Sequence, residues 1–83
     1  MKLLYFAWLR ERIGLAEEEV EPPVEVTNVA SLLEWLRGRG PGYAQALGDL
    51  TVVRVAVNLD YVKGDAPVGR NDEVALFPPV TGG

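Results

Sequence analysis

The chain has 83 residues, enough for one folded domain with a single hydrophobic core. Its 48% hydrophobic and 24% charged residues are typical of a globular domain rather than a disordered one. A net charge of -4 disfavours binding to the phosphates of nucleic acids. The chain contains no cysteine and no histidine, which excludes disulfides, thiolate nucleophiles, common zinc sites and Ser-His-Asp triads. Covalent chemistry must therefore use hydroxyls, amines, carboxylates or the chain termini, and we expect no metal site.

The N-terminal segment is apolar but short. Residues 2–9 resemble the start of a signal peptide, yet charged residues at positions 10–12 interrupt the run and no cleavage site of small residues follows. No other apolar run approaches the roughly 18 residues that a membrane span requires. We therefore expect a cytoplasmic protein with no membrane partner. Residues 2–7 are apolar at both parities, which predicts a central strand covered on both sides.

A short helix and a second strand are expected next. Residues 8–13 mix apolar and charged side chains and precede Gly14, a pattern typical of a helix with a glycine after its end. Residues 18–21 predict a strand, which a pair of prolines ends. Residues 17–19 are all glutamates, and on a strand they would point alternately to opposite faces. We interpret them as solvated edge charges rather than as an acid/base cluster.

The clearest helix follows a cap at Thr27 or Asn28. Four apolar residues recur at the spacing of one helical face: Val29, Leu32, Leu33 and Leu36. Trp35 lies on the flank of this stripe, which favours partly buried packing over stacking on a ligand. The glycine-rich residues 38–42 match neither a phosphate loop nor a dinucleotide fingerprint and predict a turn, with one short helical turn at residues 43–47.

The C-terminal half predicts three strands. Residues 51–59 alternate, with valines and Leu59 on one strongly apolar face. Turn-forming residues 58–60 lead to a short strand at residues 61–62, and a loop follows over residues 63–67. The last strand covers residues 73–77, and the two prolines after it cannot donate to a ladder.

One main helix among five strands is too few for an alternating parallel α/β fold. We therefore predict an α+β fold, a mixed sheet with one main helix packed across it. The first and last strands are the most apolar segments, so they should be central neighbours. This arrangement is the β-grasp, with a domain at residues 1–79 and a flexible Gly-Gly tail at residues 80–83.

The tail carries the most informative chemistry in the sequence. It consists of Val80, Thr81, Gly82 and Gly83, which can reach roughly 13 to 14 Å beyond the two prolines. Glycines without Cβ atoms can enter a channel too narrow for other residues. The terminal carboxylate is a poor electrophile until adenylation by ATP gives it a leaving group, which a sulfur donor could then replace. Because the chain has no cysteine, Gly83 is the only plausible position for carried sulfur.

The chain resembles the small subunit of molybdopterin synthase, a ubiquitin-like β-grasp family. The resemblance lies in residues 3–14, 55–58 and 72–83, and its most specific part is the ending from Val74 to Gly83. It implies that an adenylyltransferase similar to ubiquitin-activating enzymes uses ATP to activate Gly83, and that a sulfur donor protein then supplies a thiocarboxylate. Thr81, Gly82 and Gly83 would enter the large synthase subunit and give sulfur to cyclic pyranopterin monophosphate, forming the molybdopterin dithiolene.

The same resemblance implies a heterotetramer of two small and two large subunits. The small subunit would hold no permanent cofactor and would not be an enzyme by itself. Its implied partner-binding residues are Phe77, Pro78, Pro79 and Val80, with Phe6 and Tyr61 as weaker candidates. A core position is an equal alternative for Phe6 and a competing one for Phe77. Asn71 departs from the glycine that many relatives have before the Asp-Glu pair, but asparagine tolerates a left-handed turn.

Other functions use a similar ending. A carrier for thiamine synthesis or tRNA thiolation would share the β-grasp and the Gly-Gly terminus, although the Phe-Pro-Pro-Val ending and the greater length favour molybdopterin. A ubiquitin-like modifier would join Gly83 to target lysines. A binding module would carry the same tail without any modification.

Overall fold

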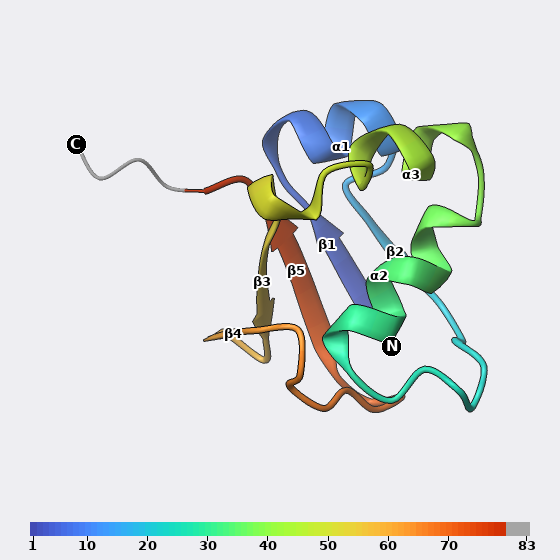
Figure 1. Cartoon of the computed structure of the whole chain (residues 1–83), viewed down its shortest axis with the longest axis vertical. Helices are drawn as coiled ribbons and strands as arrows, with labels where there is room; N and C mark the ends of the chain where they lie inside the picture. Colours follow the sequence, from blue (N-terminus) through green and yellow to red (C-terminus); the bar gives the residue numbers. More distant parts are fainter. Residues whose placement is uncertain (80–83) are drawn as a thin grey trace.

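A computed structural model describes residues 1–79 of the chain. Within this range the strands form one five-stranded mixed sheet in the order β2-β1-β5-β3-β4 (Figure 1). The strands are β1 (Lys2–Tyr5), β2 (Glu17–Glu19), β3 (Arg54–Val57), β4 (Asp60–Val62) and β5 (Glu73–Phe77). The helices are α1 (Ala7–Ile13), α2 (Val29–Arg37), α3 (Pro41–Ala46) and the 3₁₀ turn η1 (Leu50–Val52).

The first and last strands are neighbours in the middle of the sheet, as predicted. β5 runs parallel to β1, with Leu3 opposite Val74, and antiparallel to β3, with Val55 opposite Leu76. The main helix α2 packs on one face of this sheet, and the α+β architecture expected from the sequence is confirmed (Figure 1). No helix in the described part of the chain has both the length and the apolar character needed to cross a membrane.

The helix α2 begins at a capping box. Of the two candidate caps, Asn28 is the one used: its side chain accepts a 2.9 Å hydrogen bond from the Ser31 N–H. The Ser31 hydroxyl accepts in return from the Asn28 N–H at 3.1 Å, so two otherwise unpaired donors of the first turn are satisfied. The predicted apolar stripe is buried, and Trp35 lies partly buried beside it. Local periodicity was therefore sufficient to predict this element.

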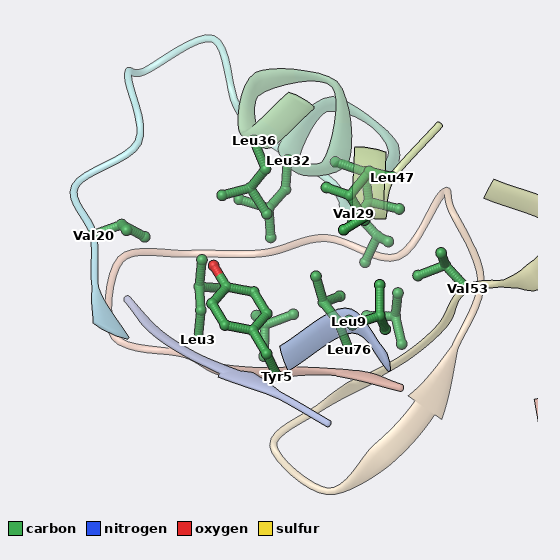
Figure 2. Close-up of a cluster of buried hydrophobic side chains, with 14 of the residues drawn as sticks. Leu3, Tyr5, Leu9, Val20, Val29, Leu32, Leu36, Leu47, Val53 and Leu76 are labelled. Atoms are coloured by element: carbon green, nitrogen blue, oxygen red, sulfur yellow. The ribbon is translucent and has the colours of Figure 1, made fainter. Parts of the chain in front are cut away.

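The core forms between α2 and one face of the sheet. Figure 2 shows Leu32 and Leu36 of α2 pointing toward Leu3, Tyr5 and Leu76, and each of these five side chains is at most 1% exposed. Burial of one such leucine stabilises the fold by about 1.5 to 3 kcal/mol. Side chains alternate along β1 and β5. The residues of these strands that lie between the core residues therefore point to the opposite face of the sheet.

The strand predicted at residues 51–59 is wrong at both ends. Residues 50–52 form η1, and the strand itself is limited to Arg54–Val57. Leu59 does not join the apolar face, because it is 87% exposed and has a φ of 75°. Asn58 has a φ of 50°, and two consecutive left-handed residues form the tight hairpin turn that joins β3 to β4.

Other boundaries differ by a few residues. β2 covers Glu17–Glu19 rather than residues 18–21, and α1 begins at Ala7. The predicted helix end before Gly14 is confirmed, with a φ of 89° at this glycine. The segment at residues 38–42 is not entirely a turn, because α3 begins at Pro41, where the missing N–H has no cost.

The interpretation of the three glutamates is correct for the outer two and wrong for Glu18. Glu18 lies opposite Leu3 in the β1–β2 pair, so its side chain points to the core face of the sheet. Its carboxylate accepts 2.7 Å hydrogen bonds from the hydroxyls of Tyr5 and Tyr43 and a 3.1 Å bond from Arg39. Only 13% of its side chain is exposed. This carboxylate is a structural acceptor rather than a solvated edge charge.

Candidate functional site

The face of the sheet that does not contact α2 carries a continuous set of apolar side chains. Leu3, Tyr5, Val74 and Leu76 point into the core, and the residues between and after them point the other way. We name this outward surface the open face; its apolar residues are Leu4, Phe6, Ala56, Tyr61, Ala75 and Phe77. Ala56 is buried but lies outside the main core cluster, as its outward position requires.

Phe77 lies on the open face at the end of β5. It is half-buried and stands opposite Arg54 of β3, and its ring centroid is 5.4 Å from that of Tyr61 with a 41° tilt. This geometry is favourable for an aromatic pair. The core side chain at this point of the strand is the preceding residue, Leu76, which is fully buried. The core alternative for Phe77 is therefore wrong, and its role as a partner anchor remains a prediction.

The two weaker candidates also lie on this surface. Phe6 is 48% exposed and Tyr61 is 80% exposed. The Phe6 N–H donates a 3.1 Å hydrogen bond to the carbonyl of Leu76, so Phe6 continues the β1–β5 ladder by one residue. The core position considered for Phe6 is wrong. Phe6 directly follows β1, Tyr61 and Phe77 belong to β4 and β5, and all three share one face.

The described chain ends beside this face. Pro78 and Pro79 follow β5 directly and are half-buried, and their lack of an N–H ends the ladder as predicted. The predicted tail residues, Val80, Thr81, Gly82 and Gly83, lie outside the described residues. The strand that precedes the tail is paired on both sides, with β1 and β3, so the base of the tail is fixed by the centre of the sheet.

Charged groups border the open face at opposite ends. Lys2 forms a 3.1 Å ion pair with Glu17, and the hydrogen bond from this pair raises the pKa of Lys2. Arg54 donates a 2.9 Å hydrogen bond to the carbonyl of Thr51, which holds its guanidinium beside the sheet. In residues 1–79, no three acidic side chains are grouped so that they could hold a metal ion. The open face is thus an exposed apolar surface with charged groups at its border.

Three residues of the open face were missed by the sequence reasoning. Leu4 was not selected because apolar residues at both parities of the first strand were interpreted as a strand covered on both sides. Ala56 was assigned to the less apolar face of its strand, and Ala75 was not considered separately from the last strand. The described chain covers only one side of the sheet. The signal was therefore present in the first and last strands, but it indicated an uncovered face that a partner could cover.

A comparison with protein families decides the relationship. Residues 3–83 match the model described as the ThiS family. The chain belongs to the ThiS family. A relative from Escherichia coli K12, named molybdopterin synthase sulfur carrier subunit, is 39% identical over all of this chain and 99% of its own length.

Solved structures agree with this assignment. A protein from Pyrococcus furiosus named molybdopterin converting factor, subunit 1, superposes with a TM-score of 0.78 at 34% identity, over 95% of each chain. The small archaeal modifier protein 1 of Haloferax volcanii superposes with a TM-score of 0.73 at 29% identity, over 96% of this chain and 97% of its own. The ubiquitin-like β-grasp predicted from the sequence is therefore confirmed.

Proposed function

We propose that this ThiS-family member is the sulfur carrier subunit of a molybdopterin synthase. The observation that carries the proposal is the full-length similarity to the E. coli relative of that name. A terminal apolar strand followed by Pro78 and Pro79 supports it, because these residues fix the base of the Gly-Gly ending beside the open face.

In this function Gly83 is the only reacting residue of the chain. An adenylyltransferase partner joins the terminal carboxylate to AMP from ATP and releases pyrophosphate. A sulfur donor protein then supplies the sulfur that displaces AMP, leaving a thiocarboxylate. No side chain of this subunit is needed for these steps, which agrees with a sequence that has no cysteine or histidine.

The acceptor is held by a second protein. The large synthase subunit takes Thr81, Gly82 and Gly83 into its active site, where cyclic pyranopterin monophosphate receives one sulfur from each of two thiocarboxylates in succession and becomes the dithiolene. Water returns each spent Gly83 to a carboxylate. Two small and two large subunits form the heterotetramer. Phe77, with Tyr61 beside it, anchors the open face on the large subunit, because paired aromatic side chains supply a large apolar contact area. The expected cytoplasmic location stays a prediction.

The first test changes only the end of the tail. Deletion of Gly83, or addition of one alanine after it, should reduce dithiolene formation to background, because the activated carbonyl is lost or displaced. The melting temperature should not change, since the core is complete within residues 1–79. Reconstitution with the large subunit and the activating enzyme measures the first quantity, and thermal unfolding the second. Normal dithiolene formation by the deletion variant would refute the proposal.

The archaeal modifier that superposes on this chain supports protein modification as a second candidate. Mass spectrometry of the protein from its native host separates the functions. A terminal thiocarboxylate supports a sulfur carrier, and Gly83 joined to lysines of other proteins supports a modifier. A thiocarboxylate that is consumed in thiamine synthesis or tRNA thiolation, and not by the large synthase subunit, would support the alternative carriers. A terminus without modification under all growth conditions would support an inert binding module.

A further inference from the structure

A hollow of the molecule lies at the β4 edge of the sheet, next to the open face. It is a groove of about 560 Å³ between α2 and the β3–β4 hairpin, and we name it the edge groove. Its lining is mainly apolar and comes from both layers: Val29 and Leu33 from α2, and Val53, Val55 and Val62 from the hairpin side. The proposed sulfur chemistry makes no use of it.

The strand beside the edge groove has a free side. β4 is the last strand of the described sheet, and only β3 pairs with it. Asn58 and Leu59 form a two-residue turn, so the flanking pair, Val57 and Asp60, exchanges backbone hydrogen bonds. The next pair, Ala56 and Tyr61, is not hydrogen-bonded, because such pairs alternate along an antiparallel ladder. The backbone N–H and carbonyl of Tyr61 therefore point away from β3. They are available to an additional strand.

Basic groups border the edge groove. Arg54 and Lys63 are among its lining residues, which include no aspartate or glutamate. Neither forms an ion pair with a carboxylate of the described residues, although the chain as a whole has a net charge of -4. An acidic ligand is therefore repelled by most of the protein and is favoured here.

The side-chain directions at this edge determine at which positions a bound strand would carry apolar or acidic residues. Val55 and Val62 point to the helix side of the sheet, while Arg54 and Tyr61 point to the open side. A strand added to β4 would alternate in the same way. Beyond Asp60, which lies on the helix side at the hairpin turn, its residues on that side would meet the apolar surface of Val55 and Val62, and those on the open side would meet basic groups.

We propose that the edge groove binds an extended segment of a partner protein in which apolar and acidic residues alternate. The segment adds to β4 as a sixth strand, with main-chain hydrogen bonds to Tyr61. Its apolar side chains enter the groove between α2 and Val62, and its acidic side chains face Arg54 and Lys63. Recognition by strand addition uses main-chain bonds for affinity and alternate side chains for specificity.

The edge groove also connects with the open face. A smaller pocket of about 200 Å³ is lined by Arg54, Val55, Tyr61, Val62 and Phe77, and its first four residues also line the edge groove. A partner on the open face could therefore extend a segment along β4 without a gap. Binding at the edge groove does not depend on Gly83, so its failure leaves the proposed sulfur-carrier function unaffected.

The test uses a short acetylated peptide in which valine and glutamate alternate, added to the full chain and followed by amide NMR. We expect shift changes at residues 61–63 and along the groove side of α2, and no binding by a peptide with the same residues grouped in two blocks. Lys63→Glu should weaken binding about tenfold, since it replaces an attraction by a repulsion. Arg70→Glu, which changes charge outside the edge groove, should leave the affinity unchanged.

Three results would overturn the proposal. They are the absence of shift changes up to millimolar peptide, shift changes confined to the open face, and equal affinity of the Lys63→Glu variant. Lys63 is exposed and follows the last residue of β4, so its substitution leaves the core intact. The dispersion of the amide spectrum reports on folding in the same experiment.

Discussion

Glu18 shows how one carboxylate can connect segments that are distant in the sequence. It lies on β2 and accepts hydrogen bonds from Tyr5 of β1 and Tyr43 of α3, with Arg39 as a third donor. Arg39 also stacks over the rings of Trp35 and Tyr43, at 5.0 and 5.2 Å from their centroids. The sheet edge, the end of α2 and α3 are thus held by one polar cluster.

The protonation states of this cluster follow from opposing effects. Burial raises the pKa of Glu18, but the hydrogen bonds from Tyr43 and Tyr5 and the charge of Arg39 outweigh it, so that the pKa lies below its ordinary value of 4.5. Burial, together with the bond to Glu18, raises the pKa of Tyr5 well above its ordinary value. Both partners therefore keep the donor and acceptor forms that the hydrogen bonds require.

The first residue-scale prediction concerns Glu18→Gln. The amide cannot accept from both tyrosines and Arg39, so the variant should lose about 2 kcal/mol of unfolding free energy at neutral pH. Because the folded-state pKa is lowered, the contribution of the carboxylate is present above its ordinary pKa and is lost as the pH falls through the folded pKa. The difference between wild type and variant should therefore shrink on acidification, which urea unfolding at several pH values measures.

Glu17→Gln is the matched control for this prediction. Glu17 lies on the same strand, but its ion pair with Lys2 is exposed, and such pairs contribute little to stability. A variant of Glu18 that is as stable as this control at neutral pH would show that the cluster does not stabilise the fold.

At the scale of elements, α1 and α3 approach each other at a glycine. A Cβ atom added to Gly42 would lie 2.5 Å from the carbonyl oxygen of Arg12, closer than any real Cβ contact. The glycine therefore permits the two short helices to pack, although glycine lowers the intrinsic helix propensity. Sequence reasoning interpreted the same residue as part of a turn.

We predict that Gly42→Ala destabilises the domain by about 2 kcal/mol, the range for overpacking a tight contact. The control is Gly38→Ala, where the new Cβ would lie 3.6 Å from the nearest atom, the Trp35 carbonyl oxygen, and φ is -82°. That substitution should be neutral or slightly stabilising, because alanine reduces the entropy of the unfolded chain. Thermal unfolding measures the melting temperatures of both variants. Equal melting temperatures would show that the close α1–α3 contact at Gly42 does not limit the stability of the domain.

The elements that sequence alone predicted are those whose causes are local. The helix α2 follows from a 3.6-residue period and a cap, and β5 from an apolar run ended by two prolines. The central pairing of β1 and β5 followed from their apolar character. The helical period, the cap and the prolines each act within a few residues, whereas the pairing of β1 with β5 was inferred by comparing two distant segments.

The failures have non-local causes. Glu18 depends on Tyr43, which lies 25 residues away, and no local pattern connects them. Leu59 is an exception, because the local turn at residues 58–59 interrupts the alternation that the sequence pattern continues. For the candidate site, sequence reasoning selected Phe6, Tyr61 and Phe77, and the structure places all three on one face. It could not show that this face is uncovered, because that depends on which side of the sheet the helices occupy.

At the scale of the whole molecule, the two faces of the sheet differ in burial. One face packs against α2 and forms the core. The other is the open face, on which Phe77 lies at the end of β5. Because the side chains of a strand alternate, Leu76 and Phe77 are consecutive residues that serve opposite faces. The domain should therefore tolerate changes on the open face better than changes in its core.

This separation gives a paired prediction on β5. Leu76→Ala should cost about 2 to 5 kcal/mol of unfolding free energy, a large share of the roughly 4 to 12 kcal/mol expected for a chain of this length. Phe77→Ala should leave most of that stability intact and weaken binding to the large synthase subunit by roughly 1 to 3 kcal/mol. Urea unfolding of the isolated domain and titration calorimetry with the large subunit measure the two quantities on each variant.

The two variants discriminate between an anchor and a packing residue. If Phe77 serves mainly to cover Tyr61 and the end of β3, Phe77→Ala will lower stability while the folded fraction binds with unchanged affinity. If it is an anchor, affinity for the large subunit will fall while the stability of the isolated domain stays nearly constant. The lost apolar contact is then made only in the complex and does not stabilise the domain by itself. Tyr61→Ala extends the comparison, since the two rings are in contact and only a shared docking role makes both substitutions weaken binding.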